Sequence, residues 1–213
     1  MLLVLRYITT KVPKPSRLDS SSTFHKQQGA LDGLCGFYSV VNAFTFIFYD
    51  GAGRRTYQLR GKREFRETLF NKLLKKFFPD DTTKASDVID TITEGTTKTN
   101  LMAIIAAAKN IVKDLFTNPA PTFKDHKTNE IKGTSDELLK HLNSACNSHC
   151  CFIIRITNSM DHWTVADGAT DARLNLIDSG GMKHFNREFI SCKPVNNTSI
   201  HVITEVYKIA LLL

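Results

Sequence analysis

One stretch organises the N-terminal half of this 213-residue chain: residues 27–44, which read QQGALDGLCGFYSVVNAF, with an apolar run that opens at Cys35. From Cys35 onward, large apolar residues recur at every third or fourth position, the repeat of an α-helix. They are Phe37, Val40, Val41, Phe44, Ile47 and Phe48. Several of the other positions are apolar as well. We therefore expect a helix over 35–49 that begins at Cys35, ends before Asp50-Gly51 and is buried on most sides.

Composition indicates a globular protein, because 42% of the residues are hydrophobic. The first residues, MLLVLRYITTK (1–11), are apolar only as far as Arg6, which is too short for a signal peptide or a membrane span. They predict a β-strand instead. Five cysteines, an odd number without the spacing of a disulfide framework, indicate a reducing compartment. We expect a cytoplasmic protein, or one delivered into a target cytoplasm, with no signal peptide and no membrane span.

Helical patterns come first along the chain and strand patterns follow. Apolar periodicity and stop signals predict further helices over 62–78, 86–93, 99–116 and 135–147. The polar, proline-bearing stretch 117–133 predicts a loop. Runs rich in β-branched residues predict strands over 151–157, 162–168, 172–178 and 200–213. This order predicts an α+β fold in one domain, 1–213, with a helical part (27–147) packed on an antiparallel sheet (150–213 plus the N-terminal strand).

Cys35 is the first candidate for chemistry. A cysteine in the first turn of a helix faces unsatisfied backbone N–H groups and the positive end of the helix dipole, which stabilise a thiolate. Gly33 and Gly36 flank Cys35, and we expect them to leave room for a substrate backbone. The alternative is a structural thiol, because cysteine is among the most buried residue types.

A cysteine nucleophile needs a base, and the base needs an orienting group. The stretch HWTVADGATDARLNLID (162–178) predicts a hairpin with its turn at 168–172. If the turn is centred on Thr170, the numbers of paired residues add up to 340, and His162 lies directly opposite Asp178. Direct partners share one face of a sheet at about 4.5–5.5 Å between Cβ atoms. The alternatives are a solvent-facing histidine at a strand end and an aspartate that only starts the turn formed by Ser179-Gly180-Gly181.

These residues resemble a known family. The order Cys35, His162, Asp178, with GLCGFYS on an early helix and HWTV followed by LIDSGG on a late hairpin, resembles papain-like cysteine peptidases. It is most similar to the small bacterial branch related to the peptidases that process bacteriocin leaders. The motif LDGLC is also similar to the DGxC of ovarian-tumour-type deubiquitinases. The resemblance covers roughly 27–48 and 150–181.

The resemblance implies roles for four residues. Cys35 is the nucleophile, His162 the base, and Asp178 the group that orients the histidine. In the family a glutamine before the cysteine donates to the oxyanion, together with the cysteine's own N–H. Gln28 matches that glutamine best and Gln27 is its neighbour. The implied activity is hydrolysis of a peptide or isopeptide bond through a thioester, with no organic cofactor and no metal.

The same catalytic groups also serve two other reactions, glutamine deamidation and acyl transfer. Either activity would suit a toxin or effector, which would have an inhibitor or immunity protein as partner. The alternative from another class is a pseudo-peptidase that binds an acidic partner without catalysis. A thiol probe that compares Cys35 with the other four cysteines separates these classes.

The net charge of +7 is confined to one segment, 54–76, which has nine basic and two acidic residues. A solvated helix face is the simplest interpretation of this segment, and docking of an acidic partner is the alternative. We expect no nucleic-acid partner, because no nucleic-acid motif accompanies the charge. The motif CNSHCC (146–151) lacks a second ligand pair elsewhere, so we expect no metal site there. Cys150 and Cys151 instead start a predicted strand.

Overall fold

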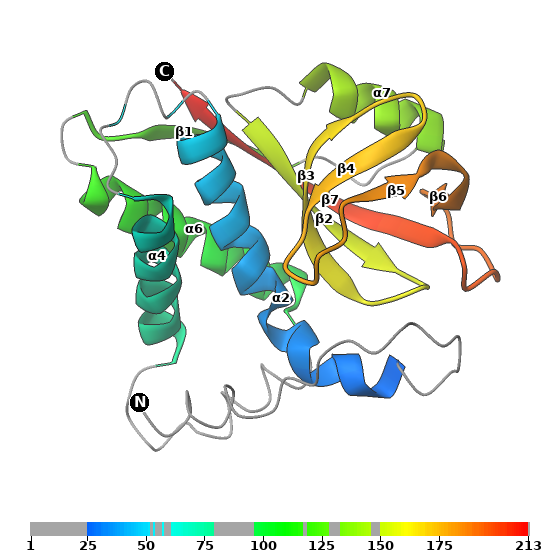
Figure 1. Ribbon diagram of the computed structural model, residues 1–213, viewed down its shortest axis with the longest axis horizontal. Helices are drawn as coiled ribbons and strands as arrows, with labels where there is room; N and C mark the ends of the chain where they lie inside the picture. The colour runs from blue at the N-terminus through cyan, green and yellow to red at the C-terminus, as the bar shows by residue number, and fades with distance from the viewer. Residues whose placement is uncertain are drawn as a thin grey trace.

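The described residues of the computed structural model form a seven-stranded sheet with helices, an α+β fold (Figure 1). The model describes residues 25–51, 53, 57, 61–78, 96–116, 119–127, 133–145 and 150–212, without the side chains of 25–33 and 125–127. The strand predicted at 1–11 and the helix predicted at 86–93 lie outside these residues.

The sheet is built mainly from the C-terminal part of the chain. Its strands are β1 (Thr122–Lys127), β2 (Cys150–Thr157), β3 (His162–Ala169), β4 (Arg173–Ile177), β5 (His184–Asn186), β6 (Ile190–Ser191) and β7 (His201–Leu212). The order across the sheet is β1-β7-β2-β3-β4-β5, with neighbours antiparallel. The short β6 pairs in parallel with β7. The four predicted strands correspond to β2, β3, β4 and β7.

The helices are α2 (His25–Thr45), which continues as the π-helix η1 (Phe46–Asp50), α4 (Lys62–Phe77), α6 (Lys98–Leu115) and α7 (Ser135–Ala145). A short 3-10 helix, η3 (Arg187–Phe189), precedes β6. The predicted helices at 62–78, 99–116 and 135–147 are therefore confirmed within a residue or two at the described ends. The residues from Cys35 to Phe48 are buried except Tyr38 and Phe46, as the apolar pattern predicted.

The predicted start of the first helix is wrong. α2 begins at His25, ten residues before Cys35. The polar stretch 25–34 has no apolar stripe, so no periodic signal marked it. Its Lys, Gln, Ala and Leu residues are nevertheless good helix formers, and no proline interrupts them. Cys35 thus lies in the interior of a helix, and the first-turn argument for thiolate stabilisation does not apply.

The loop predicted over 117–133 contains a strand, β1. This strand pairs with β7 at the edge of the sheet, from Thr122 opposite Leu212 to Lys127 opposite Tyr207. Its sequence, TFKDHK, is mostly polar. An edge strand tolerates such residues because half of its surface faces solvent, so its composition is that of a loop.

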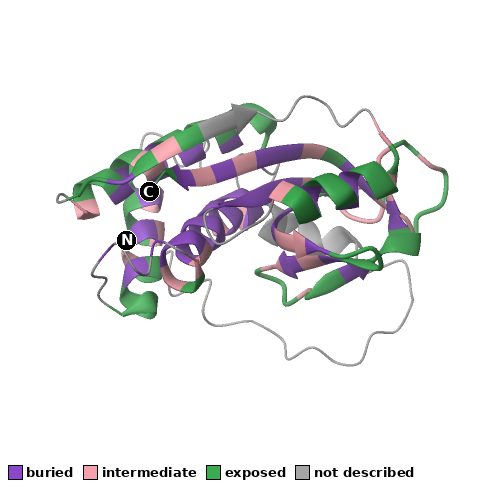
Figure 2. Cartoon of the chain, turned by 90° about the horizontal axis from the view of Figure 1, so that it is seen from above, coloured by how far each residue is buried: buried purple, intermediate pink, exposed green. Residues whose placement is uncertain are grey.

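Buried side chains form two clusters, one on each face of the sheet. Helix α2 lies on one face, where Trp163 and Val165 of β3 share its buried cluster, and α4 and α6 pack against α2 and each other. Helix α7 covers the other face, where Leu142 packs with Phe152 and Ile154 of β2. Figure 2 shows the buried residues gathered between the layers and the exposed residues along the outer surfaces. Within the described residues, no helix is both long and apolar enough to cross a membrane.

The register of the β3–β4 hairpin differs from the prediction by two residues. The predicted register pairs Val165 with Asn175, whereas the structure pairs Val165 with Ile177. A bulge between Ala166 and Gly168 shifts the pairing again near the turn. Side chains alternate with a period of two, so a shift of two residues leaves the paired residues at the open end of the hairpin, before the bulge, on their predicted face. Continuing the observed register by one residue places Asp178 opposite Thr164 rather than opposite His162.

Candidate active site

The structure brings His162 and Asp178 into direct contact, as predicted. His162 is the first residue of β3, and Asp178 follows the last residue of β4. The Nε2 atom of His162 lies 2.6 Å from Oδ1 of Asp178. The shifted register makes these residues diagonal neighbours, and diagonal neighbours remain within reach of long side chains. The predicted contact between His162 and Asp178 is confirmed, but the predicted direct cross-strand pairing of these two residues is wrong.

The loop after β4 holds the Asp178 carboxylate through its second oxygen. Oδ2 accepts hydrogen bonds from the backbone N–H of Gly180 at 2.6 Å and of Met182 at 3.3 Å. Gly181 has a φ of +89°, a conformation that favours glycine. The Asp178 side chain is 0% exposed. Asp178 therefore both starts the turn and orients His162, with one carboxylate oxygen for each task.

Cys35 reaches the same site from α2. Its side chain is buried, with 3% of the residue exposed. The backbone N–H of Trp163 points to Sγ of Cys35 at 3.4 Å. The Cys35 side chain also interacts with the His162 imidazole, and both its hydrogen bond and the charge of its thiolate raise the pKa of His162. The helix and the hairpin therefore place the thiol, the imidazole and the carboxylate together.

The electrostatics of the site favour a charged imidazole. Burial acts to lower the pKa of His162, but hydrogen bonds with Asp178 and Cys35, and the charges of both, outweigh burial and raise this pKa to about 10. Burial likewise acts to raise the pKa of Asp178, and the hydrogen bond from His162 holds it below its ordinary value. Both shifts stabilise an imidazolium beside a carboxylate.

The contact with Asp178 also fixes the roles of the two ring nitrogens. An ionised carboxylate accepts hydrogen bonds and does not donate them, so Nε2 of His162 carries a proton and donates to Asp178. In the neutral ring, Nδ1 then holds the lone pair and is the nitrogen available to a thiol proton. This is the pattern of nucleophile, base and orienting group.

Gly36 has a different function from the one predicted. A Cβ atom at Gly36 would lie 2.4 Å from Cγ2 of Thr96, so the missing side chain makes room for Thr96 rather than for a substrate. Thr96 is buried, and its carbonyl accepts a hydrogen bond from Nε1 of Trp163 at 2.6 Å. Thr96 therefore packs against α2 at Gly36 and also holds the indole of Trp163, the residue after His162, through a hydrogen bond.

The side chains of the predicted oxyanion donors, Gln28 and its neighbour Gln27, lie outside the described part of the protein. The backbone of Gln28 belongs to α2. Seven residues of continuous helix separate Gln28 from Cys35 by about 10 Å along the axis. The N–H of Cys35 lies inside the helical hydrogen-bond pattern, not at a free helix end. The oxyanion role of Gln28 stays a prediction.

One charged group next to the site was missed from the sequence. Arg155 of β2 is the cross-strand partner of Trp163 and binds Asp161, the residue before His162. The sequence does contain a sign of this residue, because Arg155 is the only charged residue in the otherwise apolar strand CCFIIRIT. Elsewhere, the described residues include no group of three or more His, Cys, Asp or Glu side chains suited to a metal ion.

The fold and the site define an α+β protein with a thiol, an imidazole and a carboxylate in contact. Comparisons with protein-family models, with curated proteins and with solved structures found no match to this chain.

Proposed function

We propose that this protein is a papain-like thiol hydrolase that cleaves a peptide or isopeptide bond. The observation that carries the proposal is the position of the His162 imidazole, which bonds to the Asp178 carboxylate at 2.6 Å and also interacts with the Cys35 thiol. The sequence resemblance to papain-like peptidases involves the same three residues. The α+β arrangement, with the cysteine helix packed on the hairpin of His162 and Asp178, supports this assignment.

The proposed reaction begins from the ion pair of a Cys35 thiolate and a His162 imidazolium, in which Nδ1 of His162 holds the proton that the Cys35 thiol gave up. The Cys35 sulfur then attacks the carbonyl carbon, and a C–S bond forms while the carbonyl oxygen becomes an oxyanion. Collapse of this intermediate breaks the C–N bond, and the His162 imidazolium gives its proton to the leaving nitrogen. The product of this half-reaction is a thioester on Cys35 and a free amine.

The second half-reaction consumes water. His162 accepts a proton from the water as the water oxygen attacks the thioester carbonyl, and collapse of the tetrahedral intermediate breaks the C–S bond. A carboxylic acid leaves, and the Cys35 thiolate is restored beside the His162 imidazolium. Asp178 keeps Nε2 protonated throughout, which leaves Nδ1 for proton transfer. Deamidation and acyl transfer use the same first steps and differ in the leaving group or in the second nucleophile.

The proposed place of action is a reducing compartment such as the cytoplasm. Cys35, Cys150, Cys151 and Cys192 are all thiols rather than disulfides. Oxidation of Cys35 would remove the nucleophile, so the proposed chemistry needs a reducing environment.

A covalent trap tests the proposed function. The protein is treated with a series of peptidyl chloromethyl ketones and digested, and the modified cysteine is located by mass spectrometry. We expect a single adduct on Cys35 and none in Cys35→Ala. The rate of Cys35 modification should be higher with some peptidyl reagents than with chloroacetamide. Equal reaction with peptidyl and non-peptidyl reagents would argue against a peptide substrate. Modification of the other thiols ahead of Cys35 would argue against a hydrolase.

A further inference from the structure

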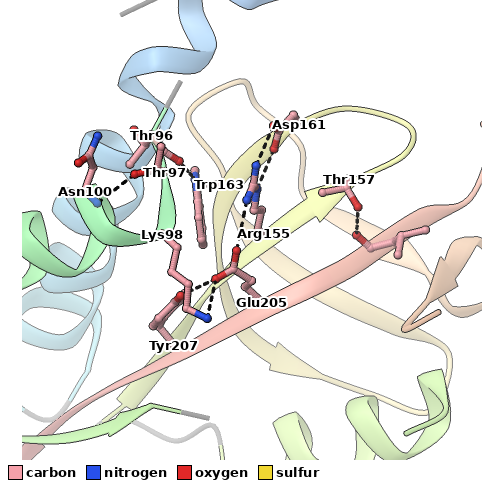
Figure 3. A network of polar contacts seen from close by, with 11 residues as sticks. Thr96, Thr97, Lys98, Asn100, Arg155, Thr157, Asp161, Trp163, Glu205 and Tyr207 are labelled. Atoms are coloured by element: carbon pink, nitrogen blue, oxygen red, sulfur yellow. Dashed lines mark hydrogen bonds and ion pairs between the residues drawn. The ribbon is translucent and has the colours of Figure 1, made fainter. Parts of the chain in front are cut away.

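A polar network surrounds the strand end that carries His162 (Figure 3). Arg155 lies at its centre. The Nε and Nη2 atoms of Arg155 each lie 2.9 Å from an oxygen of Asp161, a bidentate pair with the residue before His162. The guanidinium carbon also lies 5.6 Å from the ring centroid of Trp163, the residue after His162. One side chain thus contacts both chain neighbours of His162.

Arg155 is itself held from the other side by β7. Its Nη1 donates to Oε1 of Glu205 at 3.2 Å, and Glu205 is its cross-strand partner. The other oxygen of Glu205 accepts a hydrogen bond from the Tyr207 hydroxyl at 2.5 Å and lies 3.6 Å from Nζ of Lys98. Arg155 and Glu205 are mostly buried, with side chains 28% and 15% exposed. A planar guanidinium with fixed partners on two sides has little freedom to move.

Trp163 connects this network to the helices. Its indole Nε1 donates to the carbonyl of Thr96, just before α6, and its ring lies beside Arg155 (Figure 3). Its backbone N–H points to the sulfur of Cys35. A shift of the start of β3 would therefore move the imidazole of His162 and the N–H at the thiol together.

We propose that Arg155 is a positioning residue for the catalytic histidine: it fixes Asp161 and Trp163, and so sets the position of the His162 imidazole between Cys35 and Asp178. This inference rests on the proposed function for its effect on catalysis. Arg155 touches none of the reacting atoms. It acts through the backbone on both sides of His162.

The test compares two ion pairs whose aspartates are similarly exposed. Asp161 is 63% exposed in its pair with Arg155, and Asp136 is 56% exposed in its pair with Arg187 on the α7 side of the protein. The variants are Asp161→Asn, the matched control Asp136→Asn, Arg155→Met and Arg155→Lys. Two quantities are measured in each: the NMR signal of the His162 Nε2 proton, assigned by its loss in His162→Ala, and the rate of Cys35 alkylation.

We expect Asp136→Asn to match the wild type in both measurements. Asp161→Asn and Arg155→Met should shift or broaden the His162 signal and slow Cys35 alkylation, by up to about 10²-fold for Arg155→Met, the usual cost of a displacement of about 1 Å in a catalytic group. Arg155→Lys should resemble Arg155→Met, because lysine keeps the charge and loses the planar fork. A signal and a rate like those of the wild type in Asp161→Asn, or full recovery in Arg155→Lys, would overturn the proposal.

Two further outcomes are also decided by this design. If Arg155→Met does not fold, the Asp161→Asn variant tests the proposal instead. In that variant Arg155 keeps its ion pair with Glu205, so the fold should be preserved. If the wild-type Cys35 is not reactive, the proposed function fails, while the His162 signal alone still decides whether Arg155 positions the imidazole.

Discussion

Asp178 contacts His162 diagonally across the β3–β4 hairpin, with 2.6 Å between Oδ1 and Nε2. The same carboxylate accepts two backbone hydrogen bonds from its own loop, so the loop and the histidine share one buried anion.

The first prediction concerns pH. The pKa of His162 is raised to about 10, so the imidazolium persists at pH values where an ordinary histidine, with a pKa of about 6.5, has lost its proton. Asp178→Asn removes the charge and weakens the hydrogen bond, so the pKa of His162 should fall toward its ordinary value. The leaving nitrogen needs the imidazolium, so the alkaline limb of kcat/KM should move to lower pH.

An NMR titration of His162 together with a pH–rate profile measures this shift. Asp171→Asn, an exposed aspartate in the turn of the same hairpin, is the control and should leave the profile unchanged. An alkaline limb at the same pH in Asp178→Asn and in the wild type would show that Asp178 does not set the charge state of His162.

The second prediction concerns the oxyanion. Gln28→Ala should leave Cys35 alkylation nearly unchanged and lower turnover by about 10²–10³-fold, the usual cost of one lost oxyanion donor. Gln27→Ala is the matched control. Loss of turnover in Gln27→Ala alone would identify the neighbouring glutamine as the donor. Normal turnover in both variants would mean that the oxyanion is bound by other groups, consistent with an unbroken α2.

The third prediction concerns Gly36. Gly36→Ala places a Cβ within 2.4–2.6 Å of three side-chain atoms of Thr96, so Thr96 must move. We expect a loss of about 1–3 kcal/mol in the free energy of unfolding, the range for overpacked sites. Trp163 should also lose order, because Thr96 binds its indole. Urea unfolding and tryptophan fluorescence measure both effects, since Trp163 is the only tryptophan.

The control for Gly36 is Gly61, before α4. A Cβ at Gly61 meets nothing within 4 Å, and its φ of −54° suits alanine. Gly61→Ala should cost less stability than Gly36→Ala, because it creates no steric contact and only replaces glycine by the less favoured alanine at a helix N-cap. Equal stability of Gly36→Ala and Gly61→Ala would contradict the close packing of Thr96 on α2.

The fourth prediction concerns the basic face of α4. Phe65, Leu69 and Leu73 are buried, and Arg63, Arg66, Lys72 and Lys75 are exposed. Changing these four basic residues to glutamine together should preserve the fold and the hydrolysis of a small neutral substrate. Circular dichroism and a small-substrate assay test this. A selective loss of the association rate with a protein substrate at low salt would instead identify α4 as a docking surface.

Much of the fold followed from periodicity, and the errors have physical causes. The apolar repeats marked α4, α6, α7 and the strands β2, β3, β4 and β7, because burial selects their residues. The polar beginning of α2 and the edge strand β1 bury little, so they left no apolar signal. The contact of His162 with Asp178 was predictable because the error of two residues in register preserves the sheet face.

The bulge between Ala166 and Gly168 was not predictable, because alternation does not reveal one extra residue. The network around Arg155 depends on which strands are neighbours. Glu205 lies opposite Arg155 only because β7 inserts between β1 and β2. The sequence places these two residues 50 positions apart and contains no local sign of their pairing.

The most direct test of the central claim, that His162 activates Cys35, is the alkylation rate of each cysteine at about pH 6. Cys192 is the internal reference: it is more exposed than Cys35, and burial together with the charge of Glu137 raises its pKa to about 11. Exposure alone predicts that Cys192 reacts faster than Cys35, whereas a thiol reacts as its thiolate and the raised pKa of Cys192 slows its reaction. We predict that Cys35 reacts more than about tenfold faster than Cys192, and that His162→Ala removes the difference. Equal rates at the two cysteines, or a fast Cys35 that His162→Ala leaves unchanged, would contradict the account.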